Sequence, residues 1–185
     1  MDPKASQFFQ ITKECFSFLE DHYGYHFATM QIDDPEYFQD ATAKVVYVND
    51  TVGIEMYWYF SSRFIDVLFA ELLTPGEFPP RVKLFENSAW KRIANAPKGV
   101  TLSMLAKFLH ADDDPSFLLK EYQNLMPSKC IRRAKIIDTN MQSVMEGLAV
   151  ATQKFATSIL QGDISLFPQV IQYYTSLMQK VPGFF

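Results

Sequence analysis

The chain has little of what disulfide-bonded, nucleotide-binding and membrane-spanning proteins depend on. Two cysteines in 185 residues cannot form a disulfide framework. Seven glycines leave little material for a phosphate-binding loop, and no dinucleotide-binding, P-loop or nucleophile-elbow motif is present. No apolar run approaches the ~18 uncharged residues of a spanning helix. The opening residues lack the apolar centre of a secretory signal, so we expect a cytoplasmic protein with no membrane partner.

The sequence does have a high aromatic content. Phe, Tyr and Trp make up 15% of the residues and hydrophobic residues 48%, which excludes an intrinsically disordered chain. A domain of this length buries roughly 70% of the surface that its unfolded chain exposes. The protein therefore needs neither disulfides nor a metal for stability, and we expect no cofactor.

The first part of the chain predicts a helix followed by antiparallel strands. Apolar residues recur at helical spacing near the N-terminus until Gly24, which favours a left-handed helix end. Residues 25–32 can form a strand. The range 43–73 is rich in apolar and β-branched residues between turn signals such as Asn49-Asp50, which predicts a meander of three strands.

The second part of the chain predicts helices and loops only. Three prolines and a glycine between Thr74 and Pro80 mark a connection. Beyond it, apolar positions at helical spacing predict a helix capped by Thr101 and a long helix from residue 128 or 129 to Leu160. A last helix follows Gly162.

These elements together predict an α+β fold. An N-terminal helix packs with a three- to four-stranded antiparallel meander, and a mainly helical C-terminal half packs on it. We expect residues 1–185 to form a single domain. Residues 1–74 would supply the first helix and the sheet, 75–80 the proline-rich connection, and 81–185 the helical part.

Few residues indicate catalysis. Cys130 precedes basic residues at the expected start of the long helix, where the helix N-terminus and the cations both favour a thiolate. A nucleophilic cysteine also needs a base, and nothing places His22, His26 or His110 beside it. His22 and His26 are four residues apart, but Gly24 stands between them, so we predict no metal site. A small enzyme built on Cys130 or a histidine is an alternative, with no catalytic residue assigned.

Charge is distributed unevenly along the chain. Residues 1–74 carry 12 acidic and 4 basic residues, a net charge of −8, whereas residues 75–135 carry 6 and 11, a net charge of +5. The acidic part could attract a basic protein and the basic part could contact nucleic acid; alternatively the two neutralise each other within one domain. The isoelectric point near 5.4 is far below that of usual nucleic-acid binders, so a nucleic-acid-associated protein is the less favoured reading.

A candidate contact surface lies on the expected sheet. If the tryptophan of the strand after Asn49-Asp50 faces the core, alternation places Glu55, Tyr57 and Tyr59 on the opposite face. Tyrosines beside an acid are good contact groups, because they are rigid and amphipathic. The acids Asp33 and Asp34 would add charge that steers a basic partner. The alternative is that a helix covers this face as well.

Four short segments resemble a group of known proteins. They are FSFLE (16–20), HYGY (22–25), VVYV (45–48) and SILQGD (158–163). Together they are similar to segments of small bacterial proteins, some of which resemble immunity proteins of toxin–antitoxin-type loci. The resemblance implies a protein that acts by binding another protein, and it assigns no catalytic residue. We therefore expect a protein–protein interaction module, immunity-like in its action, with a basic protein as its partner.

Overall fold

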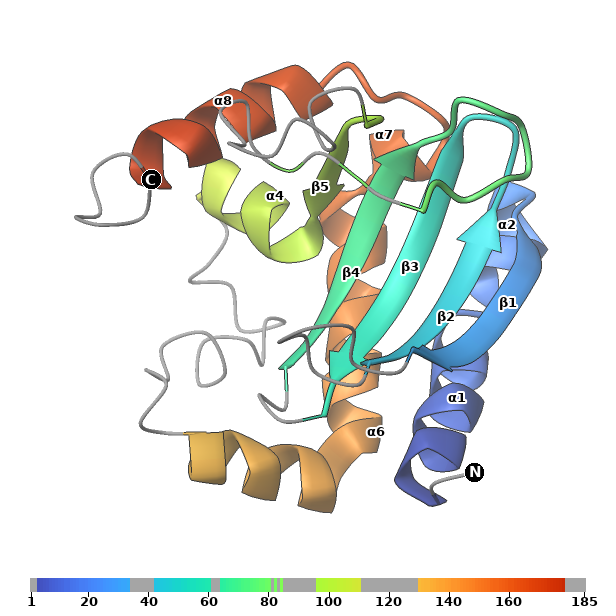
Figure 1. Ribbon diagram of the computed structural model, residues 1–185, viewed down its shortest axis with the longest axis vertical. Coiled ribbons are helices and arrows are strands. Elements are labelled where there is room, and N and C mark those ends of the chain that lie inside the picture. The colour runs from blue at the N-terminus through green and yellow to red at the C-terminus, as the bar shows by residue number, and fades with distance from the viewer. Residues whose placement is uncertain are drawn as a thin grey trace.

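The computed structural model describes residues 3–33, 42–60, 64–80, 82, 84, 96–110 and 130–178. Among them, five strands form one antiparallel sheet, and helices from both ends of the chain lie against it (Figure 1). The expected α+β fold, with a helix first, a meander next and helices in the C-terminal half, is confirmed.

The N-terminal segment forms two helices, whereas the apolar spacing predicts one. Helix α1 spans Pro3–Cys15 and α2 spans Phe18–Tyr23. Between them the N–H of Leu19 donates to the carbonyl of Phe16 over 3.0 Å, which closes a tighter turn than that of an α-helix. Both side chains are fully buried, so the apolar stripe continues across the break. Gly24 ends α2 in the left-handed region, with φ of 69°, as its position predicts.

The sheet is a meander, and its strands lie side by side in chain order. The side-chain oxygen of Asn49 accepts from the N–H groups of Thr51 (2.8 Å) and Val52 (2.7 Å), which fixes the turn between the second and third strands. The strands are β1 His26–Asp33, β2 Thr42–Val48, β3 Val52–Tyr59, β4 Phe64–Glu71 and β5 Gly99–Thr101.

Strand β5 corrects the expectation of helices and loops alone after the proline-rich connection. It is three residues long and pairs with Leu68, Phe69 and Ala70 of β4. Three residues are too few to show an alternating pattern, so the sequence carried no signal for it. Position 99 requires glycine because a Cβ at this position would overlap the side chain of Val82.

The C-terminal helices differ in two respects from the expected long helix, which is kinked at Asn140 and is broken at Ala156 (φ −110°, ψ 18°), so that its last turn forms a separate helix. Their bounds are α4 Leu102–Phe108, α6 Cys130–Phe155, α7 Thr157–Leu160 and α8 Phe167–Met178. The backbone of α6 leaves helical geometry at Asn140 (φ −151°, ψ 34°), whose side-chain oxygen accepts from the hydroxyl of Ser143 over 2.8 Å. Asparagine favours such local bonds over helix continuation, which accounts for the kink. The predicted cap of α4 is present, because Thr101 accepts from the N–H of Met104 over 3.2 Å.

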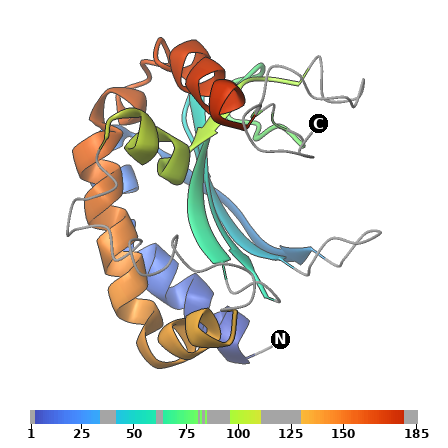
Figure 2. The same cartoon turned by 90° about the vertical axis from the view of Figure 1, so that its left-hand side faces the viewer.

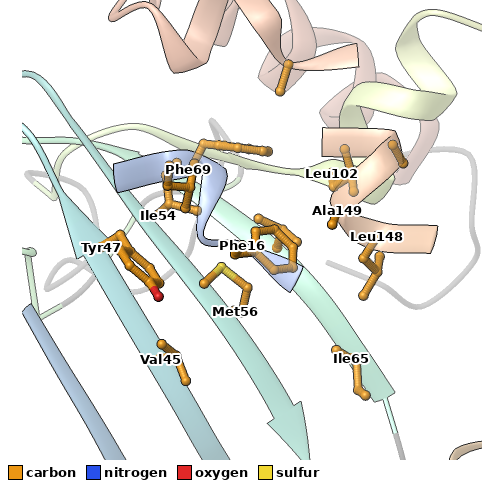
Figure 3. Close-up of a cluster of buried hydrophobic side chains, with 14 of the residues drawn as sticks. Phe16, Val45, Tyr47, Ile54, Met56, Ile65, Phe69, Leu102, Leu148 and Ala149 are labelled. Carbon is orange, nitrogen blue, oxygen red and sulfur yellow. The ribbon is translucent and has the colours of Figure 1, made fainter. Parts of the chain in front are cut away.

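The hydrophobic core lies between the sheet and one layer of helices. Figure 2 shows α1, α4 and α6 on the same side of the sheet. Figure 3 shows side chains of this core, among them Tyr47 and Met56 of the sheet, Phe16 from the N-terminal region and Leu148 from α6. One continuous cluster thus joins both halves of the chain. In the described ranges no helix is both long enough and apolar enough to cross a bilayer.

Candidate functional site

The side of the sheet that faces away from α1, α4 and α6, here called the outer face, carries the predicted contact residues. In β3, Trp58 is 1% exposed and belongs to the core. Glu55 and Tyr57 are half-buried and Tyr59 is 37% exposed, as the alternation predicts. Figure 2 shows α1, α4 and α6 on the opposite side of the sheet, although Asp66, which pairs with Tyr57 and so shares this face, is buried and accepts a bond from Ser103 at the start of α4. The sequence places Trp90 before Lys91-Arg92, which predicts a more accessible side chain than that of Trp58, but Trp90 lies outside the described residues.

Three ring side chains meet on the outer face and form what we call the outer aromatic cluster, Tyr57, Tyr59 and Phe64. The ring centroids of Tyr57 and Tyr59 are 5.2 Å apart in an edge-to-face arrangement, and Phe64 of β4 lies 6.2 Å from Tyr57. Beside the cluster, Lys44 Nζ lies 3.9 Å from a carboxylate oxygen of Glu55. Edge-to-face contacts stabilise ring pairs beyond their burial, so each ring helps to hold its neighbour in place.

The other end of the outer face is covered by the chain itself. Residues 72–78 cross it, and Phe78 packs on Val46 and Val48, which are buried there. The ring of Phe78 approaches β3 so closely that a Cβ at Gly53 would lie 2.8 Å from its Cε2 atom. The outer face is therefore divided between a covered end and an end that carries the outer aromatic cluster.

The backbone pairing brings Asp33 to the same end of the sheet as this cluster. Asp33 closes β1 and pairs with Thr42 of β2, and Thr42 in turn pairs with Tyr59. Asp33 and Tyr59 are thus two strands apart in one row, a separation of about 10 Å. Of Asp33 the structure describes the backbone only, and Asp34 lies outside the described residues.

The histidines singled out in the sequence are not brought together. His22 lies in the last turn of α2 and His26 is the first residue of β1, with the left-handed Gly24 between them, and both side chains are exposed. His110 follows α4, where its ring lies 6.5 Å from that of Tyr173. Among the described side chains, no three His, Cys, Asp or Glu residues are placed to hold a metal ion.

Neither cysteine has a described environment that favours a thiolate. Cys15 is half-buried on α1, and burial together with the charges of Glu146 and Glu14 raises its pKa to about 11. Helix α6 begins at Cys130, which agrees with the expected start of the long helix, but its side chain lies outside the described part of the chain.

One buried carboxylate was missed by the sequence analysis. Asp66 of β4 is 1% exposed and accepts from the hydroxyl of Ser103 over 2.6 Å and from the N–H of Val67 over 2.8 Å. It stands just beyond the point where β5 ends, so the first turn of α4 supplies its partner. Burial raises the pKa of Asp66 to about 6, and the bonds from Ser103, Val67 and Thr101 oppose this shift. The sequence feature that could have identified Asp66 is an acidic residue in the middle of a strand that carries apolar residues on both of its faces.

Comparison with known proteins identifies no relative: no family model matches the chain, and no curated protein or solved structure matches it either. The geometry and charge of the outer face are therefore the basis for a functional proposal.

Proposed function

We propose that this protein acts by binding another protein through the outer aromatic cluster, in the manner of an immunity-like inhibitor. The observation that supports the proposal is a set of rings braced against one another on two adjacent strands, with Tyr59 37% exposed. Tyrosine is enriched in interface hot spots because it supplies a large contact area at a small cost in conformational entropy. Rings that are already ordered lose less freedom when a partner covers them.

The partner that fits this surface is a basic protein. The described residues up to Pro80 include nine acidic residues and three basic ones. One of the three, Lys44, lies beside Glu55 on the outer face, and Asp33 ends β1 in the same row as Tyr59. Excess charge of one sign steers an oppositely charged partner and raises the association rate, and salt weakens this effect.

The experiment distinguishes the residues that contact the partner from the acidic residues whose charge only raises the association rate. The partner is captured from the native host with the wild-type chain, purified, and measured by surface plasmon resonance at several salt concentrations. Tyr57→Ala with Tyr59→Ala should mainly speed dissociation, because it removes contacts that form only in the complex. Asp33→Asn with Asp34→Asn should mainly slow association, and only at low salt.

A matched control uses two exposed apolar residues away from the outer face. Val150 is 52% exposed on α6 and Leu109 is 42% exposed after α4, so Val150→Ala with Leu109→Ala removes comparable exposed surface. This variant should bind like the wild type. An acidic partner, an association rate that ignores salt, or equal losses in the control and the tyrosine variant would each contradict the proposal.

A further inference from the structure

The pairing between β4 and β5 ends beside a buried carboxylate. Strand β5 pairs with β4 through three residues, the last of which is Thr101 opposite Leu68. Continued antiparallel pairing would place residue 103 opposite Asp66, but the chain turns into α4 before that position. Figure 1 shows this junction at the edge of the sheet, with α4 directly after β5. Asp66 therefore lies where strand pairing ends and the helix begins.

The carboxylate of Asp66 accepts hydrogen bonds from the β5–α4 side of this junction. The hydroxyl of Ser103 donates to it over 2.6 Å, and the N–H of Ser103 and the hydroxyl of Thr101 donate as well. The hydroxyl of Thr101 also accepts from the N–H of Met104 over 3.2 Å, so the cap of α4 and the bonds of Asp66 share one residue. These bonds supplement a ladder of three residue pairs between β4 and β5.

The burial of Asp66 is not balanced by a cation. Its side chain is 1% exposed, and no Lys, Arg or His among the described side chains forms an ion pair with it. The titratable groups around it are Tyr174 of α8, whose pKa is raised by burial and by the charge of Asp66, and Tyr57, its partner in β3. On α4, Lys107 Nζ lies 5.7 Å from the centre of the Tyr174 ring, and β5 has no titratable side chain. A buried charge in such surroundings costs free energy that a protonated carboxyl does not.

We propose that the protonation state of Asp66 controls a local opening in which β5 and the first turn of α4 separate from β4. The protonated carboxyl is neutral, so it can stay buried and the junction stays closed. The ionised carboxyl regains its hydration when the junction opens, so ionisation favours the open form. Burial outweighs the hydrogen bonds in this balance, because the pKa of Asp66 is raised to about 6 in spite of them. Opening therefore becomes more frequent as the pH rises towards this value.

This opening does not require the rest of the sheet to unfold. Strand β5 is the last strand of the sheet and is three residues long, whereas β2, β3 and β4 pair with one another over seven or eight residues. Short edge elements open at a lower free energy than the centre of a domain. The inference concerns the edge at β5 and requires no partner, so it does not depend on the proposed function.

The test is hydrogen–deuterium exchange of the full chain from pH 4 to pH 8, with each rate divided by the intrinsic exchange rate at the same pH. The probes are the amides of Met104, which donates to Thr101, and of Glu71, which donates to the carbonyl of Lys98 over 2.9 Å. Their opening constants should rise about fiftyfold from pH 4 to pH 7. Dilute urea should hardly change these constants, because a local opening exposes little surface, whereas amides that exchange through global unfolding should respond strongly.

Three variants assign the response to Asp66. Asp66→Asn should make the opening constants of the probe amides independent of pH. Ser103→Ala removes a bond that lowers the pKa of Asp66, so the rise should move to higher pH. Asp163→Asn, at an exposed carboxyl before α8, should respond like the wild type. Opening constants that stay level with pH in the wild type, a pH response that persists in Asp66→Asn, or probe amides that respond to urea as steeply as those of β2 would overturn the inference.

Discussion

Asp66 should make the stability of this protein fall as the pH rises from about 4 to about 6. Burial raises the pKa of this carboxyl from 3.8 to about 6 in the folded chain. Between these two values the folded state holds a proton that the unfolded state has released. The folded state therefore binds more protons, and its stability falls with rising pH until the folded carboxyl has ionised.

The size of the effect follows from the two pKa values. A difference of one pKa unit corresponds to about 1.4 kcal/mol, so a shift from 3.8 to about 6 corresponds to about 3 kcal/mol. The full stabilisation from the protonated carboxyl is present below pH 4 and is lost above pH 6. This is a large fraction of the ~5–15 kcal/mol that stabilises an ordinary domain.

The measurement compares wild type with Asp66→Asn by urea unfolding at several pH values from 4 to 8. The difference between the two free energies of unfolding cancels the titration of every other group. We expect the wild type to lose about 2 kcal/mol relative to Asp66→Asn between pH 4 and pH 7, because the rest of the difference is already lost below pH 4. Ser103→Ala should move the transition to higher pH, because the bond from Ser103 is the largest of the interactions that lower the pKa of Asp66.

Asp163→Asn serves as a control with the opposite sign. Bonds from Ser165 lower the pKa of this exposed carboxyl, so its contribution to stability is lost as the pH falls. If the difference between wild type and Asp66→Asn stays constant from pH 4 to pH 8, Asp66 titrates at its ordinary pKa and the argument from its burial is wrong.

Three further predictions concern packing. The hydroxyl of Tyr47 is buried without a hydrogen-bond partner in the described part of the chain, so Tyr47→Phe should stabilise by about 1 kcal/mol in urea unfolding; a loss of stability would reveal a partner. Gly53→Ala should destabilise by about 1–3 kcal/mol, because the new methyl group collides with Phe78, and a neutral result would show that Phe78 moves freely. Residues 1–74 expressed alone should aggregate or stay unfolded, since their core face is completed by α6, whereas a cooperative melt of this fragment would contradict a single domain.

The elements that the sequence predicted well are those whose signals are local. The alternation in β3 predicted that Trp58 is buried and that Tyr57 points away from it. The turn at Asn49 and the cap at Thr101 each depend on bonds within three residues along the chain. Such contacts form wherever the chain adopts the element, so periodicity and capping rules suffice to predict them.

The features that the sequence did not predict depend on distant partners or on competing local bonds. The partner of Asp66 is Ser103, 37 residues away, and no spacing rule connects them. Phe64 joins Tyr57 in the outer aromatic cluster only because of the register between β3 and β4. The kink in α6 depends on a bond of the Asn140 side chain that periodicity does not report. The fold class could therefore be predicted from the periodicity of apolar residues, whereas the composition of the candidate site could be seen only from the register between paired strands.

The position of α6 in the chain has a consequence for synthesis on the ribosome. The meander is complete as far as Glu71, but α6, which covers part of its core face, ends 84 residues later at Phe155. At about 5–20 residues per second, that interval lasts about 4–17 s. During this time the nascent chain exposes apolar side chains such as Ile65 and Val67, which are buried in the folded protein, because α6 has not yet been synthesised. Each new molecule thus passes through a stage lasting seconds in which a chaperone that recognises apolar strands can bind it before the helix arrives.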